Sequence, residues 1–216
     1  MSTVGRPNIH FQDKRNELIR IAFDLFMSKG YEATTIADVL RVAGISKGSL
    51  YHYFASKEEI LDAVIEYLGE LAQKAYVPML ENSQMTAMEK LKNLFSALNN
   101  PNQMIRQTED YVLNQKKSLF HYYLRDKNER LMAEAYDLII QQGIQEGVFH
   151  VPDSKIVARI LASSSSIQNG TSFPSRSEIA VYTQMMERCL GTPTGYLDEI
   201  GDSIARKHDD YRQYHQ

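Results

Sequence analysis

Apolar residues recur at helical spacing along almost the whole chain. Between residues 13 and 29 they stand at positions i, i+3, i+4, i+7 and i+8, as Leu18, Ile21, Ala22, Leu25 and Phe26. This spacing places one apolar stripe on an amphipathic helix. Gly30 follows, and glycine adopts the left-handed conformation on which helices often end. The pattern predicts a helix over 13–29.

Three further helix starts are marked by a hydroxyl residue with an acid three positions later. The pairs are Thr35 with Asp38, Ser56 with Glu59, and Thr86 with Glu89. In a capping box each side chain accepts a hydrogen bond from the other residue's backbone N–H. The predicted helices end at Gly44, at Pro78 and at residues 99–101, respectively.

The remaining segments also favour helices. Ser46 predicts the start of a short helix that ends near Phe54, and the other helices are expected over about 129–146, 154–168 and 177–190. Residues 103–123 are less regular, but nothing in them breaks a helix. The chain has only 11 Gly and 6 Pro, too few for the many turns of an all-β protein. The predicted fold class is all-α.

Composition narrows the class of protein. A hydrophobic content of 43% with 24% charged residues is typical of a globular chain. The single cysteine, Cys189, cannot form a disulfide within the chain, and no apolar run is long enough for a signal peptide or a membrane helix. We therefore expect a cytoplasmic protein without a membrane segment.

Charge is distributed unevenly between the two ends. Residues 1–57 contain eight Lys or Arg and five Asp or Glu, whereas residues 58–216 contain sixteen and twenty-two. A basic head on an acidic body indicates an anionic partner for the head.

The segment 35–54 has the pattern of a helix-turn-helix. Two short helices are joined by Ala43-Gly44-Ile45, and a short turn containing glycine sets the two helices of this motif at a steep angle. The glycine suits a turn that needs positive φ. Because an α-helix fits the DNA major groove, the second helix is predicted to contact DNA.

Candidate DNA-binding residues are polar or compact. On the outward side of the second helix they are Ser46, Lys47, Gly48, Ser49, Tyr51 and His52. Phosphate contacts are expected from Thr34 and Thr35 at a helix N-terminus, from Tyr51, and from Lys57 at the next helix start. No acid occurs from Arg41 to Lys57, as a surface against phosphate requires. Since one short helix contacts few base pairs, a two-fold dimer reading two half-sites is expected.

These residues resemble the tetracycline-repressor (TetR) family of transcription regulators. The resemblance is carried by the segments Ala22-Phe23-Asp24-Leu25-Phe26, Thr34-Thr35-Ile36-Ala37-Asp38-Val39, Ala43-Gly44-Ile45-Ser46-Lys47-Gly48-Ser49-Leu50-Tyr51-His52-Tyr53-Phe54 and Ser56-Lys57-Glu58-Glu59. It is dense over 13–65; beyond that only a general helical pattern agrees.

The resemblance implies a homodimer of all-α subunits. Each subunit would have an N-terminal three-helix DNA-binding domain (1–57), a helical effector-binding and dimerisation domain (58–195) and a polar tail (196–216). Helices 154–168 and 177–190 of two subunits would pack as a four-helix bundle. A small-molecule effector in the C-terminal domain would change the separation of the DNA-binding domains and release a palindromic operator, most often as a repressor.

The effector site is predicted from mixed aromatic and polar residues, since small-molecule sites combine apolar walls with a few polar groups. The candidates are Arg106, Tyr111, Phe120, Tyr123 and Tyr136. Core packing is an equal explanation for each. The six histidines show no metal-binding spacing, and no nucleotide loop or nucleophile motif occurs. We expect neither metal, cofactor nor catalysis.

Two other classes of function stay open. One is a helical protein-interaction module that does not act on DNA. The other is a four-helix enzyme with a site in the C-terminal half. Salt dependence of binding separates DNA recognition from the first, because phosphate contacts release counterions.

Overall fold

The computed structural model describes residues 9–97, 108, 118–164, 175–202 and 205. Throughout these residues the chain forms helices joined by turns, without strands, which confirms the all-α prediction. The chain divides into two compact units: unit 1 holds residues 1–68 and 117–124, and unit 2 holds residues 69–116 and 125–216. None of the helices in the described ranges combines the length and apolarity that a membrane crossing needs.

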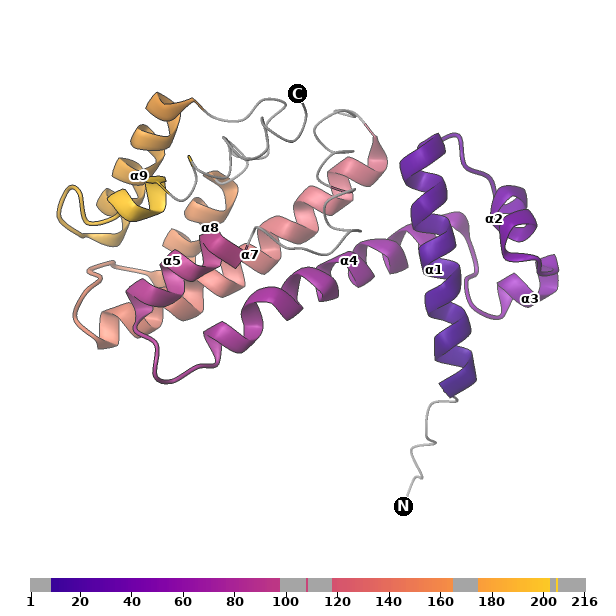
Figure 1. The fold of residues 1–216 in the computed structure, drawn as a ribbon, viewed down its shortest axis with the longest axis horizontal. Coiled ribbons are helices and arrows are strands. Elements are labelled where there is room, and N and C mark those ends of the chain that lie inside the picture. The colour runs from indigo at the N-terminus through magenta and orange to yellow at the C-terminus, as the bar shows by residue number, and fades with distance from the viewer. Residues whose placement is uncertain (1–8, 98–107, 109–117, 165–174, 203–204, 206–216) are drawn as a thin grey trace, which may run out of the picture. The chain divides into compact units, whose positions relative to one another are not determined.

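Unit 1 is built around the long first helix (Figure 1). Its helices are α1 (Ile9–Lys29), α2 (Ile36–Ala43), α3 (Lys47–Tyr51), the first half of α4 (Lys57–Leu80) and the first residues of α7 (Leu119–Gln145). The α2 helix packs beside α1.

An apolar core holds the short helices of unit 1 in place. The fully buried side chains are Leu18, Ile19, Ala22, Phe23 and Phe26 of α1, Val39 of α2, Leu50 of α3, Phe54, and Ile60, Leu61, Val64 and Leu68 of α4. Isolated helices shorter than about 12 residues are marginal in water. The eight-residue α2 and the five-residue α3 therefore depend on this core.

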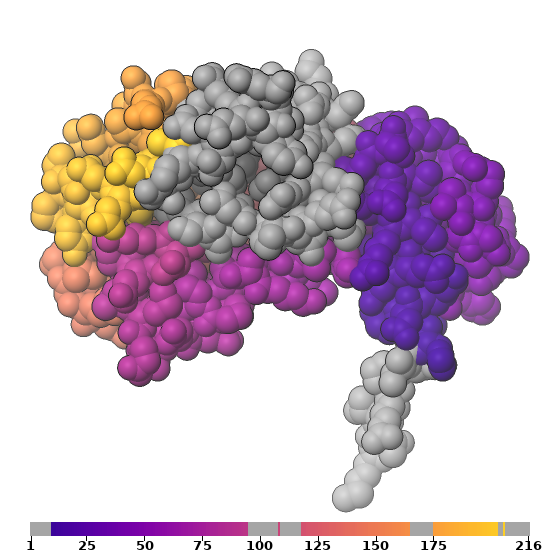
Figure 2. Space-filling view, in the orientation of Figure 1, coloured from indigo at the N-terminus to yellow at the C-terminus, as the bar shows by residue number. Residues whose placement is uncertain are grey.

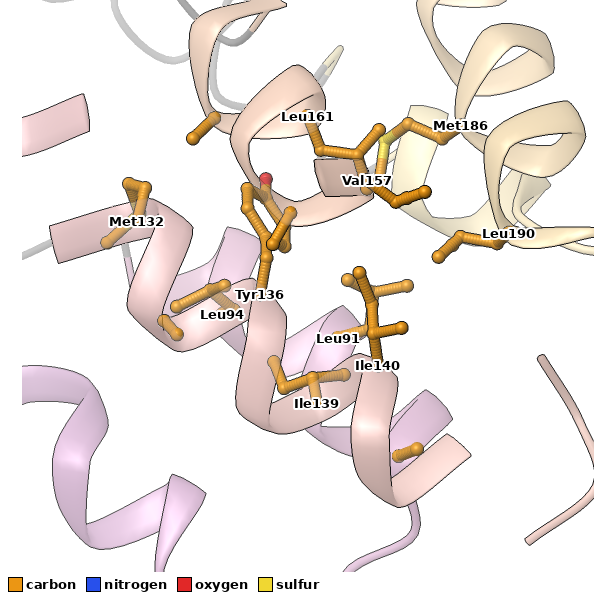
Figure 3. Close-up of a cluster of buried hydrophobic side chains, with 14 of the residues drawn as sticks. Leu91, Leu94, Met132, Tyr136, Ile139, Ile140, Val157, Leu161, Met186 and Leu190 are labelled. Carbon is orange, nitrogen blue, oxygen red and sulfur yellow. The ribbon is translucent and has the colours of Figure 1, made fainter. Parts of the chain in front are cut away.

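Unit 2 contains the rest of α4 and α7, together with α5 (Ala87–Ala97), α8 (Ser154–Ser164) and α9 (Arg176–Leu190). Figure 3 shows its core, in which residues of α7 face α5, α8 and α9. The labelled members are Leu91, Leu94, Met132, Tyr136, Ile139, Ile140, Val157, Leu161, Met186 and Leu190.

A glycine in α7 permits part of this packing. A Cβ on Gly143 would lie 2.0 Å from the ring of Phe149, which is fully buried. Contacts this short do not occur between real side chains. Gly143 is therefore selected by close approach of the Phe149 ring, not by an unusual backbone angle.

The prediction that Pro78 ends its helix is wrong. The α4 helix continues through Pro78 to Leu80. Proline removes one backbone hydrogen bond, but Tyr76 is buried in the core of unit 2 and Met79 and Leu80 pack against it. The Lys90 ammonium also donates a hydrogen bond to the Leu80 carbonyl at 2.6 Å. Tertiary packing thus outweighs the local helix-breaking signal.

The helix predicted to start near residue 129 begins ten residues earlier. Ser118 Oγ accepts a hydrogen bond from the His121 backbone N–H at 3.1 Å, which caps α7 at its start. Phe120 is fully buried and its ring lies 6.2 Å from that of Phe26. This contact joins residues far apart in the sequence, so spacing along the chain gives no sign of it. Residues 103–107 and 109–117 of the irregular segment lie outside the described ranges.

Two boundaries in unit 1 also differ from the predicted ones. The α1 helix begins at Ile9, four residues before the predicted start, and α3 ends at Tyr51 instead of near Phe54. After α3 the backbone N–H groups of Tyr53 and Phe54 both donate to the Leu50 carbonyl, at 2.8 and 3.0 Å. This tight turn brings Phe54 into the core.

Burial in unit 2 extends beyond α9. Leu197 and Ile200, the first apolar residues after position 196, are fully buried. The carboxylate of the buried Glu187 accepts a hydrogen bond from the Leu197 backbone N–H at 2.9 Å. This bond fixes the segment after α9 to the core.

Candidate nucleic-acid interface

The N-terminus of α2 is held by the predicted capping box. Thr35 Oγ1 accepts a hydrogen bond from the Asp38 backbone N–H at 3.2 Å, and Asp38 Oδ2 accepts one from the Thr35 backbone N–H at 2.9 Å. Lys29, the last residue of α1, donates to the same carboxylate oxygen at 2.6 Å. The hydrogen bonds from Lys29 and then Thr35 hold the pKa of Asp38 well below its ordinary value.

The turn between α2 and α3 depends on Gly44. Its φ is 63°, and its backbone N–H donates to the Leu40 carbonyl. A Cβ at this position would meet no atom within 4 Å, so the left-handed backbone conformation, and not lack of space, selects glycine. The predicted positive-φ turn of the helix-turn-helix is confirmed.

The α3 helix separates an inner side from an outer one. Ser46 caps it by accepting a hydrogen bond from the Ser49 backbone N–H at 3.2 Å. Leu50 faces the core of unit 1, where Phe54 joins it. The predicted DNA-binding residues Ser46, Lys47, Gly48, Tyr51 and His52 are all exposed, while Ser49 is half-buried.

Lys47 and Tyr51 form one connected feature on this outer side. The Lys47 ammonium lies 5.8 Å from the centre of the Tyr51 ring, and the Tyr51 side chain is 47% exposed. At neighbouring Gly48, a Cβ would meet only Ser46 Oγ, at 4.0 Å. The surface at Gly48 is therefore open, which lets another molecule approach the α3 backbone closely. Figure 2 shows the exterior of unit 1 to which α2 and α3 contribute, in violet.

Thr34 is placed differently from the other candidates. Its side chain is 1% exposed, and its hydroxyl donates to the Gly30 carbonyl at 2.7 Å. Its backbone N–H also donates to the carbonyl groups of Gly30 and Tyr31. Both donors are used within unit 1, so Thr34 holds the turn after α1 and is not presented to a phosphate.

Lys57 lies at the start of α4 and is half-buried. Its ammonium donates to the Glu32 backbone carbonyl at 3.3 Å and lies 4.2 Å from the centre of the Tyr31 ring. Burial, followed by the nearby Glu58 and Glu32 carboxylates, raises the pKa of Tyr31. Lys57 therefore joins α4 to the turn before α2, in addition to the phosphate contact predicted for it.

Aromatic contacts that the sequence pattern did not reveal hold the segment after α3. The rings of Phe11 in α1 and Tyr53 are stacked with centres 4.6 Å apart. The Arg15 guanidinium lies 5.1 Å from the centre of the Phe54 ring. Phe11 lies in the first turn of α1, before the predicted helix start at residue 13, so the sequence pattern did not place it on this helix.

The electrostatics of this surface favour an anionic partner. Residues 41–57 carry Arg41, Lys47 and Lys57 and no acid. The nearest preceding acid, Asp38, is paired with Lys29 and lies 3.5 Å from the Arg41 guanidinium. A short exposed helix with cationic, hydroxyl and aromatic groups can enter the major groove while the flanking groups contact phosphates.

The predicted effector residues that the structure describes are divided between the two units. Phe120 lies in the core of unit 1 and Tyr123 is partly exposed on the same turn of α7. Tyr136 lies in the core of unit 2 (Figure 3), and its pKa is raised by burial and by neighbouring Tyr182. Arg106 and Tyr111 lie outside the described residues. The apolar stripe of α9 contains Tyr182, which the sequence reasoning did not select.

Within the described ranges, no group of three or more His, Cys, Asp or Glu side chains is placed to hold a metal ion. Cys189 is half-buried and packs against the core of unit 2.

Comparison with known proteins agrees with this geometry. Residues 18–64 match the model of bacterial regulatory proteins of the tetR family. The HTH-type transcriptional repressor KstR2 of Mycobacterium tuberculosis H37Rv is 31% identical over 144 residues, which cover 65% of this chain and 70% of that protein. KstR2 of Mycolicibacterium smegmatis is 32% identical over 146 residues, covering 65% and 69%.

Solved structures show the same fold. Salmonella enterica GusR superposes with a TM-score of 0.62 at 18% identity, covering 88% of this chain and 100% of that one. A gamma-butyrolactone receptor (ArpA-like protein) superposes with a TM-score of 0.55 at 20% identity, covering 93% and 99%.

The matched residues 18–64 include the capping box of α2, the Gly44 turn and the whole of α3. The similarity to the KstR2 repressors extends well beyond this segment. The chain belongs to the tetR family of bacterial regulatory proteins.

Proposed function

We propose that this chain is a transcriptional repressor that binds a palindromic DNA operator as a homodimer and leaves it when a small molecule occupies its C-terminal domain. The observation that carries the proposal is α3: a capped helix after a left-handed glycine, with Lys47, Gly48 and Tyr51 exposed in a stretch free of acids. The chain is a DNA-binding transcriptional regulator. It would act in the cytoplasm, where it meets its operator.

Base reading is assigned to the outer side of α3, through Lys47, Ser49 and His52. Phosphate contacts are assigned to Thr35, Tyr51 and Lys57, with Arg41 added because its guanidinium is exposed in the last turn of α2. Ser46 caps α3 and is also exposed, so it would lie beside the major groove of the bound DNA. Phosphate contacts position the protein, whereas contacts to base edges specify sequence.

The homodimer is supported by exposed apolar side chains on α8 and α9. Ile156 and Ile160 of α8 are each 47% exposed, and Val181 of α9 is 66% exposed. Ile156 and Ile160 are one helical turn apart, so they lie on one face of α8. A two-fold interface across α8 and α9 would cover these residues and supply two α3 helices for the two halves of a palindrome.

The effector site is assigned to unit 2, where the Tyr136 hydroxyl would be its hydrogen-bonding group. Tyr136 is fully buried among apolar side chains of α5, α7 and α8. Neighbouring Tyr182 adds a second phenol, whose pKa is raised by burial. Apolar side chains with a few polar groups suit an apolar molecule that carries one hydrogen-bonding group.

The direct test is selection of bound duplexes from a random pool, followed by affinity measurements on the recovered sequence. We expect a palindrome with half-sites about one helical turn apart. Affinity should fall steeply as salt rises. Recovery of no sequence motif, or affinity that does not change with salt, would favour the protein-interaction module instead.

Two variants separate the assigned roles. Tyr51→Ala should weaken binding to every duplex, whereas Lys47→Ala should change which bases are preferred. Lys74→Ala, at an exposed position in the part of α4 that belongs to unit 2, is the matched loss of a cation and should change neither property. If Lys47→Ala leaves the base preferences unchanged, base reading is wrongly assigned.

A further inference from the structure

Glu32 lies in the turn between α1 and α2, three residues before the capping residue Thr35. Its Oε1 accepts a hydrogen bond from the backbone N–H of Leu119, the first residue of α7, at 2.9 Å. The first N–H groups of a helix have no partner inside the helix. Glu32, in the turn before α2, therefore supplies a hydrogen-bond acceptor to the first turn of α7. Its negative charge is also favourable at a helix N-terminus.

The same residue is fixed from a second side. The Glu32 backbone carbonyl accepts the hydrogen bond from Lys57, in the first turn of α4. Directly before it, the ring of Tyr31 lies 5.2 Å from that of Phe26, and Phe26 in turn packs against Phe120 of α7. The starts of α4 and α7 thus meet at one turn, 30–34, which leads into the helix-turn-helix.

These two helices both continue from unit 1 into unit 2. In α4 the division falls between Leu68 and Gly69, and in α7 it falls between Leu124 and Arg125. The contacts at Glu32 lie wholly within unit 1. These contacts connect the turn before α2 to the first turn of α7 as well as to α4.

We propose that Glu32 is a positioning residue for DNA binding, which fixes the orientation of the helix-turn-helix by holding the first turn of α7. The inference rests on the proposed function. Two DNA-binding units bind one duplex more tightly when both are already correctly oriented. A unit that is free to reorient loses that conformational freedom on binding, and this loss lowers the affinity. Glu32 restricts this freedom before binding, without touching the DNA.

The sign of the effect distinguishes positioning from simple electrostatics. Glu32 is an exposed acid close to a surface proposed to contact phosphates. By charge alone, removing it should strengthen DNA binding. If it positions the helix-turn-helix, Glu32→Ala should weaken binding in spite of the lost negative charge.

The experiment compares Glu32→Ala, Glu32→Gln and wild type in the full-length chain, with Asp24→Ala as control. Asp24 is an exposed acid of α1, so its loss removes the same charge from unit 1. Each protein is titrated with the selected palindromic duplex and with a duplex holding one half-site. Circular dichroism and thermal unfolding confirm that each variant is folded.

We expect Glu32→Ala to bind the palindrome about fivefold more weakly, the factor that corresponds to loss of a typical helix cap. The loss should be much smaller on the single half-site, where only one DNA-binding unit is engaged. Glu32→Gln keeps an oxygen acceptor and should recover most of the affinity. Asp24→Ala should bind as tightly as wild type or more tightly.

Hydrogen exchange at the Leu119 amide gives a reading that does not involve DNA. Exchange there should be faster in Glu32→Ala than in wild type and close to wild type in Asp24→Ala. If wild type binds no duplex, the proposed function fails and the positioning role fails with it. If wild type binds but Glu32→Ala binds the palindrome equally or more tightly, or loses as much on the half-site, the positioning role alone is overturned.

Discussion

Lys29 at the end of α1 and Asp38 in the first turn of α2 form an ion pair with an Nζ–Oδ2 distance of 2.6 Å. The pair joins two helices across the turn 30–34, and Asp38 at the same time completes the capping box of α2. One carboxylate therefore sets both where α2 begins and how it is held against α1.

Asp38→Asn should lower the thermal stability of the chain at neutral pH. The pKa of Asp38 is lower in the folded state than its ordinary value near 3.9. A group of this kind stabilises the fold above its ordinary pKa and loses that contribution as pH falls toward the folded value. The difference in Tm between wild type and Asp38→Asn should thus be largest above about pH 5 and shrink steadily below it.

A double-mutant cycle with Lys29→Met identifies the partner. Lys29→Met should destabilise wild type more than it destabilises Asp38→Asn, because the second background has already lost the ion pair. Equal effects in both backgrounds, or a Tm difference that does not change with pH, would show that the pair contributes nothing to stability.

Gly44→Val should impair folding of the helix-turn-helix. The φ of 63° is a conformation that β-branched residues strongly resist. Gly48→Ala is the matched change, since a Cβ there meets only Ser46 Oγ, at 4.0 Å, and alanine favours helix. Thermal unfolding should show a lower Tm for Gly44→Val and none of this loss for Gly48→Ala.

Operator affinity completes the comparison of these two glycines. Gly48→Ala should keep its fold but bind DNA more weakly, because the added methyl group holds the α3 backbone away from the groove. Unchanged affinity in a folded Gly48→Ala protein would contradict close approach at this position.

Gly143→Ala should destabilise unit 2 by about 1–3 kcal/mol, the usual cost of overpacking. The new Cβ would lie 2.0 Å from the Phe149 ring, and this clash outweighs the gain of roughly 1 kcal/mol in helix propensity. Chemical denaturation measures the loss. Adding Phe149→Leu should restore part of the stability in the Gly143→Ala background, while Phe149→Leu alone should lower it. Additive losses would mean that the two residues do not compete for space.

Ile160→Glu should convert the proposed homodimer to a monomer. It places a charge on the partly exposed apolar face of α8, next to Ile156. Light scattering gives the mass, and Lys155→Glu, an exposed change on the same helix, serves as control. The Ile160→Glu protein should also lose affinity for a palindrome. A dimer that persists in Ile160→Glu would move the interface away from this face.

Local patterns were sufficient where the physics is local. The capping boxes at Thr35 and Thr86 and the left-handed glycine at position 44 involve residues within a few positions of each other. The placement of Tyr51 on the outward side of the second helix also follows from periodicity, and it is confirmed.

Sequence reasoning failed where packing, or a hydrogen bond formed only in the folded chain, decides the outcome. Pro78 stays inside α4 because the residues around it pack in the core of unit 2. Thr34 turns inward because the carbonyl of Gly30 takes its hydroxyl. In each case a strong local signal was overridden by packing or by a hydrogen bond available only in the folded chain.

The sequence by itself determined an all-helical chain and the helix-turn-helix near its N-terminus, since caps, periodicity and a glycine turn are encoded within a few residues. Only the tertiary structure decided where α7 begins, that Thr34 faces inward, and that Glu32 holds Leu119. The hydrogen bond between Glu32 and Leu119 joins residues 87 positions apart, and spacing along a chain carries no information about which distant groups will meet.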